Sequence, residues 1–162
     1  MDRYSYNPAM GTQIHITDIE AAINYWRVQP GMIEGVSLGA PLRELAAVYG
    51  LMVYQKKTEI DPAQMSMKAK EAWMQWYLTT PDAPCIAICT TSQGDMVCKG
   101  CGRTFEEVQY WTAMTPPQKR AVWRRIVQEG TAWRFTRYKE RAADVAKDDQ
   151  PVSPDEDKKK VK

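Results

Sequence analysis

Residues 84–104 read PCIAICTTSQGDMVCKGCGRT and hold all four cysteines of the chain, spaced C-x3-C-x8-C-x2-C. Four thiols within one short stretch indicate a shared centre, because zinc ions and iron–sulfur clusters both take thiolate ligands from paired cysteines. The second pair lies in Cys98-Lys99-Gly100-Cys101-Gly102. Its glycines permit a tight turn in which backbone N–H groups point at sulfur. We therefore expect Cys85, Cys89, Cys98 and Cys101 to bind one metal ion or cluster.

The spacing does not decide which metal is bound, since Zn²⁺ and an iron–sulfur cluster both accept four thiolates. The second pair has the spacing of a zinc site and no fourth cysteine lies far away, which favours Zn²⁺, with an iron–sulfur cluster as the alternative. A competing interpretation is that the cysteines are buried apolar side chains or form a disulfide. The single histidine, His15, lies far upstream, and we expect it to cap a helix or lie on the surface.

Catalytic motifs do not stand out: we find no Ser-His-Asp set, Gly-rich phosphate loop or paired-carboxylate motif in the sequence. A site in which all four cysteines bind the metal is closed, with no position for water or substrate. We therefore expect a non-catalytic accessory or regulatory protein without a small-molecule substrate, which binds a protein or nucleic-acid partner. The alternatives are an iron–sulfur redox or sensor protein, and a DNA- or RNA-binding protein.

The chain has 162 residues, of which 44% are hydrophobic, enough for one domain or two small ones. Its first residues, MDRYSYNP, lack the apolar run of a signal peptide, and no stretch is long and apolar enough to cross a bilayer. We expect a cytoplasmic protein that does not bind membranes. In a reducing compartment, clustered cysteines are more often metal ligands than disulfides.

Helix signals recur along the first half of the chain. Thr17 and Glu20 have the spacing of a capping box, Pro41 suits the first turn of a second helix, and Asp61-Pro62 suits the start of a third. The expected buried faces are Ile16, Ile19, Ile23 and Trp26; Leu42, Leu45, Tyr49 and Met52; and Met65, Ala69, Trp73 and Trp76. Three amphipathic helices of this kind predict a small bundle.

Helix signals return after the cysteines. Thr104 with Glu107 forms a capping box, Thr115-Pro116-Pro117-Gln118 begins another helix, and Thr131 begins a last one. Their expected buried residues are Phe105, Val108 and Trp111; Val122, Ile126 and Val127; and Phe135, Tyr138, Ala142 and Val145. The proline-containing stretch 80–84 is the natural boundary between the two halves.

The predicted fold is mainly α: a small N-terminal helical bundle, followed by a four-cysteine metal-binding loop that packs on two or three short helices. We divide the chain into a helical domain (1–80), a four-cysteine module with basic helices (81–146), and a charged tail (147–162). The composition of this tail predicts disorder.

Positive charge is concentrated just after the cysteines, where residues 98–141 carry a net charge of +6. The candidate residues for binding a protein or nucleic acid are Lys119, Arg120, Arg124, Arg125, Arg134 and Arg137. Arginines bind phosphates, and the tryptophans among them could stack on bases. The competing interpretation is a solvated outer face of amphipathic helices. Arg103 and Thr104 follow Cys101-Gly102, so we expect both next to the site. Arg103 is expected to screen the negative charge of the thiolates, and the alternative is that it contacts an anion or a partner.

Two segments resemble known families. The segment with the cysteines resembles a short bacterial four-cysteine family of unknown function. The matching residues are Pro84-Cys85 through Cys89, Cys98-Lys99-Gly100-Cys101-Gly102-Arg103-Thr104, Glu107 and Trp111. That family is often labelled a predicted Fe–S protein, so the resemblance, over residues 83–128, raises the iron–sulfur alternative. Residues 14–55, with the stretches INYWR and LAAVYG, resemble a second, uncharacterised proteobacterial family. This second resemblance implies no activity.

Overall fold

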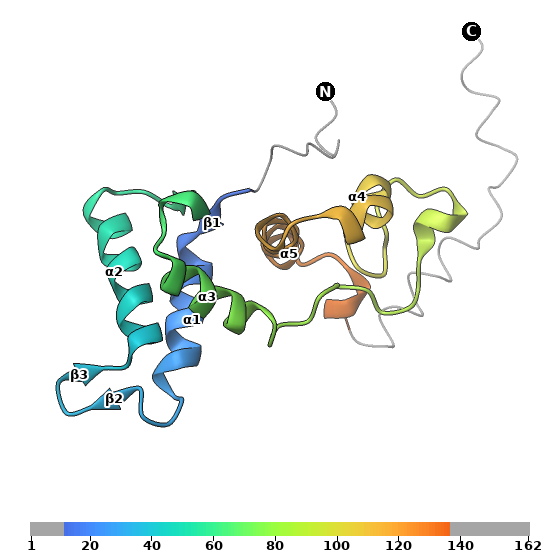
Figure 1. Ribbon diagram of the computed structural model, residues 1–162. Helices are drawn as coiled ribbons and strands as arrows, with labels where there is room; N and C mark the ends of the chain where they lie inside the picture. Colours follow the sequence, from blue (N-terminus) through green and yellow to red (C-terminus); the bar gives the residue numbers. More distant parts are fainter. Residues whose placement is uncertain (1–11, 137–162) are drawn as a thin grey trace, which may run out of the picture.

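The computed structural model describes residues 12–136. Their first part is a bundle of three helices, α1 (Ile16–Arg27), α2 (Ala40–Tyr54) and α3 (Met67–Tyr77), which pack against one another (Figure 1). The helices share a core of buried side chains: Ile14, Ile19, Ala22, Leu45, Val48, Met52, Ile60, Met65, Ala69, Ala72, Trp73, Trp76 and Tyr77. We call residues 14–77 the N-terminal bundle.

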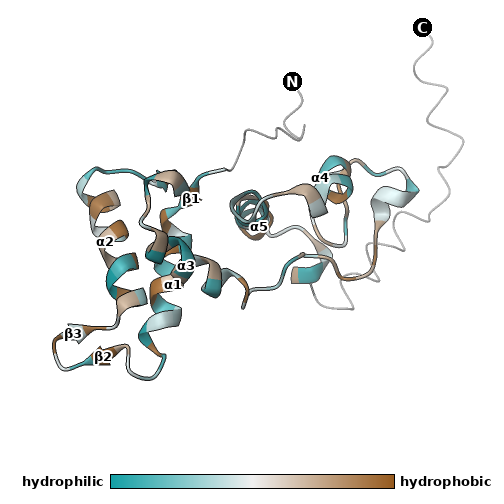
Figure 2. Cartoon of the chain, viewed as in Figure 1, coloured by the Kyte–Doolittle hydropathy of each residue, from teal (hydrophilic) through white to brown (hydrophobic). Residues whose placement is uncertain are grey.

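Two short antiparallel sheets accompany these helices. β1 (Ile14–His15) pairs with β4 (Glu59–Ile60), and β2 (Ile33–Glu34) pairs with β3 (Ser37–Leu38). The second pair is a hairpin between α1 and α2 that projects from the bundle in Figure 1. Its strand residues are exposed, and Figure 2 shows hydrophobic colour on both strands.

The first helix begins two residues earlier than the capping box predicts. Its N-cap is His15, whose Nδ1 accepts a hydrogen bond of 3.3 Å from the backbone N–H of Thr17. The pairing of β1 with β4 fixes this start, and it continues into the helix: the N–H of Ile16 donates to the carbonyl of Thr58, the residue before β4, at 2.8 Å. The expectation that His15 caps a helix is confirmed, whereas Thr17 as N-cap is wrong. Glu20 accepts instead from the Tyr49 hydroxyl at 2.9 Å.

The buried faces of the second and third helices follow the apolar periodicity. In α2, Leu42, Leu45 and Met52 are buried as predicted, and Val48 is buried where Tyr49 was expected. All four residues predicted for the third helix are buried. Asp61, however, caps the 3₁₀ turn η1 (Pro62–Gln64), and α3 itself begins after Ser66, whose hydroxyl accepts from the N–H of Ala69 at 3.1 Å.

The second part of the described chain has its own small core. Its elements are η2 (Thr90–Gln93), α4 (Phe105–Tyr110), η3 (Trp111–Ala113), α5 (Pro116–Glu129) and η4 (Trp133–Phe135). Trp111, Met114, Val122, Ile126 and Ala132 form the core. We call residues 81–136 the cysteine module. In Figure 1, α5 is seen nearly end-on between the N-terminal bundle and α4.

The capping box predicted at Thr104 with Glu107 is present, and the helix predicted to begin at Thr115 also starts with a capping box, formed with Gln118. Three predicted core residues are exposed instead: Phe105 at 39%, Val127 at 58% and Phe135 at 44%. The helix predicted from Thr131 is the short turn η4 within the described residues. Its other expected core positions, Tyr138, Ala142 and Val145, lie outside them, as does the tail 147–162.

The mainly α fold is confirmed, with five α-helices and two two-stranded sheets between residues 12 and 136. Over that same range, every helix is too short or too polar to cross a bilayer.

Replacing Thr104 with alanine should lower the free energy of unfolding by about 1 kcal/mol, because Thr104 is the N-cap of α4. Its hydroxyl accepts from the N–H of Glu107 at 3.1 Å, and the Glu107 carboxylate accepts from the N–H of Thr104 at 2.9 Å. Urea unfolding followed by tryptophan fluorescence measures the loss. Thr112→Ala, at an exposed position of η3, is the control. Equal stability of the two variants would contradict the prediction.

Candidate metal centre

The second cysteine pair forms a closed turn, residues 98–102, which we call the knuckle. The N–H of Cys98 donates to the carbonyl of Arg103 at 2.8 Å, and the N–H of Gly102 donates to the carbonyl of Cys98 at 2.7 Å. Gly102 has φ +80°, a left-handed conformation that favours glycine. Both cysteines of the knuckle are 1% exposed. The tight turn predicted from the glycines is therefore present.

Backbone groups of the knuckle and of Thr90 donate to the sulfur of Cys98. Burial raises the pKa of the Cys98 thiol, but hydrogen bonds from the backbone at Thr90, Cys101 and Gly100 outweigh burial and leave the pKa below its usual value. As a thiol, Cys98 donates to the carbonyl of Ile88 at 3.4 Å. Donors aimed at a sulfur stabilise its thiolate, which is the form that binds metals.

Cys101 lies beside a buried arginine. Burial raises the pKa of the Cys101 thiol, and Arg103 opposes this shift, since its Nε donates to the Cys101 sulfur at 3.4 Å. Arg103 is 6% exposed, and its guanidinium stacks 4.7 Å from the centre of the Trp111 ring. Arg103 therefore lies beside Cys101, and its charge-screening role stays a prediction. Thr104 is buried at the start of α4.

The first cysteine pair lies on the loop that packs against the knuckle. Cys85 is exposed and Cys89 is half-buried. Between them, Ala87 has φ +64°, and its N–H donates to the Cys85 sulfur at 3.4 Å. Because a non-glycine residue in this conformation is strained, the loop has an unusual shape imposed on it.

Close contacts fasten this loop to the knuckle. A Cβ added to Gly100 would lie 2.4 Å from the carbonyl oxygen of Ile88, so the two backbones touch where only glycine fits. The N–H of Lys99 also donates to the hydroxyl of Thr90 at 3.0 Å. The fold therefore brings the two cysteine pairs into one region, although they are separate in sequence.

The four sulfurs do not all meet. Among the described residues, no three Cys, His, Asp or Glu side chains are grouped closely enough to hold a metal ion. Cys98 and Cys101 fit one half of a thiolate site, buried and with donors aimed at sulfur. Cys85 and Cys89 lie on the adjoining loop. His15 is absent from this region, since it caps α1.

The predicted basic residues have partners within the chain. Lys119 pairs with Asp82 at 2.6 Å, and Arg125 pairs with Glu107 at 2.5 Å and Glu129 at 3.0 Å. Arg120 and Arg124 both pair with Asp18. Arg134 donates to the carbonyl of Pro84 and stacks on Trp123. Arg137 lies outside the described residues. Figure 2 shows α5 mainly in hydrophilic colour. The carboxylates named here balance most of the positive charge on this helix.

The residue that sequence reasoning missed is Asp18. It lies inside the predicted capping box, yet it is buried and accepts from two arginines of α5. The available signal was weak: Asp18 is one residue before buried Ile19 and four before buried Ala22, so it shares the inward side of α1.

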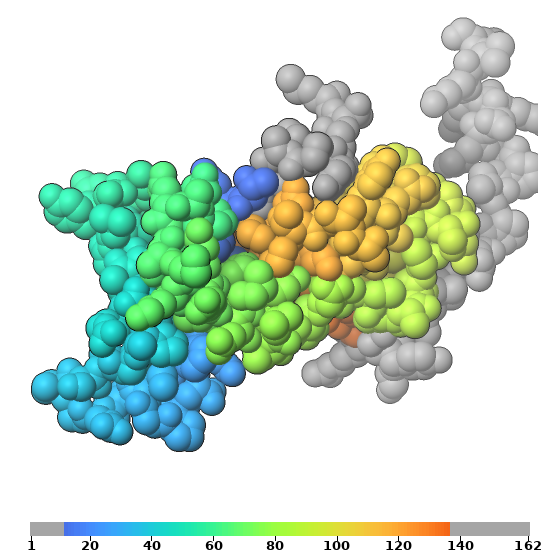
Figure 3. Space-filling view, viewed as in Figure 1, coloured from blue at the N-terminus to red at the C-terminus, as the bar shows by residue number. Residues whose placement is uncertain are grey.

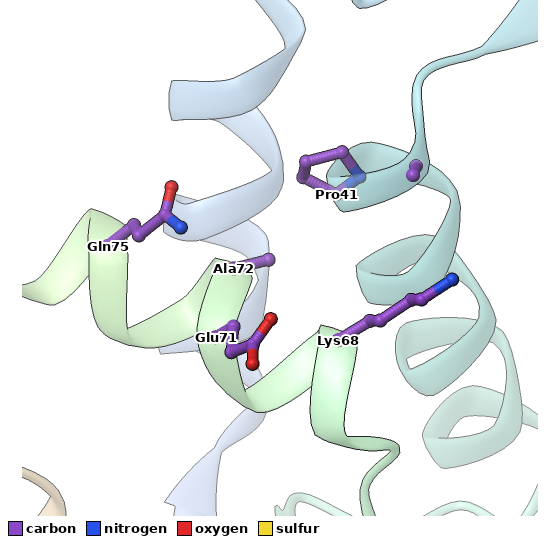
Figure 4. A pocket seen from close by; sticks show the side chains of 6 residues that line it. Pro41, Lys68, Glu71, Ala72 and Gln75 are labelled. Atoms are coloured by element: carbon purple, nitrogen blue, oxygen red, sulfur yellow. The ribbon is translucent and has the colours of Figure 1, made fainter.

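A shallow pocket in the N-terminal bundle, of about 240 Å³, is distinct from the cysteines. Figure 4 shows its side chains: Pro41 at the start of α2, and Lys68, Glu71, Ala72 and Gln75 along α3. The charged and amide side chains are exposed to solvent. It therefore offers no fixed, buried polar group of the kind that orients a small ligand.

Family comparisons divide the chain at the same place as the two cores. Residues 83–130, which contain all four cysteines, match one family model. Its description is "Protein of unknown function (DUF1289)". Residues 12–78 match a second model, described as "Protein of unknown function (DUF3717)". No curated protein and no solved structure is significantly similar to the chain. Both resemblances inferred from the sequence are therefore confirmed.

Proposed function

We propose that this chain is a non-catalytic metal-binding protein in which Cys85, Cys89, Cys98 and Cys101 hold one structural metal ion. The observation that carries the proposal is the knuckle, where two buried cysteines lie in a closed turn and backbone groups donate to sulfur. Cysteines that serve only as apolar packing need no hydrogen-bond donors directed at sulfur. A thiolate that binds a metal does need them.

The packing of the first loop supports the participation of all four cysteines. Ile88, which lies next to Cys89, contacts both Gly100 and the Cys98 sulfur. The loop is therefore already adjacent to the knuckle. A bound metal would join the two pairs and thereby stabilise a module whose apolar core is small.

Charge also supports the proposal. Zn²⁺ with four thiolates carries a formal charge of −2. The buried guanidinium of Arg103 next to Cys101 supplies a compensating positive charge that a neutral thiol pair would not need. We favour Zn²⁺, with an iron–sulfur cluster as the alternative ligand of the same cysteines. The proposal includes a reducing compartment such as the cytoplasm, where thiols stay available.

We further propose an accessory role, in which the metal supports binding rather than reaction. Since Lys119, Arg120, Arg124, Arg125 and Arg134 have partners inside the chain, their internal contacts argue for a structural use of α5 over a nucleic-acid surface. Binding to DNA or RNA at low salt that Arg124→Ala with Arg125→Ala weakens would support the nucleic-acid role instead.

Metal analysis of protein purified without oxygen tests the proposal. We expect one Zn²⁺ per chain, a colourless solution, and reactive thiols only after chelation. A brown protein with iron, sulfide and visible absorption would establish the iron–sulfur alternative. Protein that carries no metal, takes up none, and shows four freely reactive thiols would refute the proposal.

A further inference from the structure

Asp18 joins the two halves of the chain. Its carboxylate belongs to the first turn of α1, and its side chain is 2% exposed. Arg120 donates through Nε to Oδ1 at 3.1 Å, and Arg124 donates through Nη1 to Oδ2 at 2.5 Å. Both arginines come from α5 of the cysteine module. A buried carboxylate of the bundle is thus paired with two arginines of the other module.

α5 also covers the end of α3. The guanidinium of Arg120 lies 5.3 Å from the centre of the Trp76 ring, in addition to its pairing with Asp18. In Figure 3 the orange surface of α5 lies directly against the blue and green surfaces of the N-terminal bundle. When α5 is in place, one acidic and one aromatic side chain of the bundle are therefore shielded.

The opposite side of α5 rests on the knuckle. A Cβ on Gly102 would lie 3.2 Å from two carbons of Ile126, so the knuckle backbone is in contact with this α5 side chain. Arg125 Nη1 donates to the carbonyl of Gly102 at 3.2 Å. α5 thus has two contact surfaces, one for the knuckle and one for the bundle.

We infer that α5 is a latch, formed by Arg120 and Arg124 on Asp18, that closes on the bundle while the knuckle is intact and opens when the knuckle loses its metal. This inference rests on the proposed metal site. A helix of 14 residues is marginal in water without tertiary contacts. Loss of the Ile126 and Gly102 contacts therefore removes the support that positions the two arginines.

The ion pairs make this response switch-like. Removing one partner of a buried ion pair leaves the other unpaired and poorly solvated, so an arrangement with α5 half-detached is unfavourable. Full separation lets water solvate the carboxylate and both guanidinium groups. Opening of the latch exposes Asp18, Trp76 and the two arginines together.

Trypsin cleavage of the full-length protein after Arg120 and Arg124 tests the latch, because the closed latch shields both side chains. Fragments are identified by mass spectrometry, and hydrogen exchange of residues 16–22 reports on the bundle side. We expect chelation under reducing conditions to accelerate cleavage about tenfold or more and to raise exchange in residues 16–22. Metal content is measured on the same samples.

Asp18→Asn opens the latch from the bundle side, since it keeps the shape and removes the charge. We expect metal content to stay unchanged, while the cleavage rate at Arg120 and Arg124 rises to that of the chelated wild type. Asp82→Asn is the matched control, because Asp82 also pairs with an α5 cation, Lys119, but is exposed. It should leave cleavage at Arg120 and Arg124 within about twofold of wild type.

Gly102→Ala opens the latch from the knuckle side without altering a cysteine, because the added Cβ crowds Ile126 at 3.2 Å and alanine is strained at a φ of +80°. Protein that loses its metal yet protects Arg120 and Arg124 as before overturns the latch and leaves the proposed function standing. Asp18→Asn with wild-type protection also overturns it. If the purified wild-type protein carries no metal, the proposed function and the metal dependence of the latch are both overturned. The cleavage rate of Gly102→Ala at Arg120 and Arg124 then decides whether the knuckle controls α5.

Discussion

Cys98→Ser is expected to reduce the metal content from one ion per chain to nearly none and to unfold the cysteine module. The Cys98 sulfur is buried and receives backbone donors from both sides of the site. A serine hydroxyl is a poor ligand for zinc at neutral pH. Structural zinc supplies an apparent ~10–16 kcal/mol in zinc-finger peptides, as much as the whole stability of a typical domain.

Metal analysis, near-ultraviolet circular dichroism for aromatic packing and far-ultraviolet circular dichroism for the helices check this result together. The signals of Trp111 and Trp123, in and against the core of the module, should be lost, and the helices of the N-terminal bundle should persist. Cys85→Ser is the informative comparison. Cys85 is exposed, so its replacement disturbs little packing, but it should weaken metal binding if all four cysteines are ligands. Full metal content and an intact module in Cys98→Ser would refute the site.

Gly100→Ala is expected to lower the free energy of unfolding by about 3 kcal/mol, at the upper end of what overpacking costs. The added Cβ would lie 2.4 Å from the carbonyl oxygen of Ile88, a backbone atom that cannot rotate away. Relief requires the loop with the first cysteine pair to separate from the knuckle. We therefore expect weaker metal binding as well, although no ligand is altered.

Gly50→Ala is the matched control, measured by the same urea titration. Gly50 lies in α2 and is exposed, and a Cβ added to it would meet no atom within 4 Å. Alanine there should raise stability by about 0.5–1 kcal/mol, because it favours the helix. If both glycine variants change stability in the same direction and by similar amounts, the contact between loop and knuckle is not the cause.

Local signals predicted much of the fold. The apolar stripe of α3 and the capping boxes at Thr104 and Thr115 depend on neighbours within a few residues, and the structure has them. The start of α1 was misplaced because pairing between β1 and β4, which is distant in sequence, fixes it. The glycines of the knuckle indicated a tight turn. The left-handed conformation of Ala87 was not predictable, because alanine rarely adopts it.

The candidate site was predictable in composition but only partly in arrangement. Cysteine spacing identified the knuckle, and the position of Arg103 next to Cys101 suggested its screening role. The partners of the basic residues were not predictable, because Asp18 and Arg124 are 106 positions apart and no periodicity connects them. A run of basic residues has the same sequence pattern whether its side chains are solvated or pair with a buried carboxylate.

The sequence separation between Asp18 and its arginines orders the assembly of the protein in time. During synthesis from the N-terminus, the bundle is complete at Tyr77, long before α5 exists. Asp18 therefore lacks both arginine partners until synthesis reaches Arg120, 102 positions after Asp18. We expect docking of the two halves to be the last and slowest event of folding, since its contacts have the greatest loop to close.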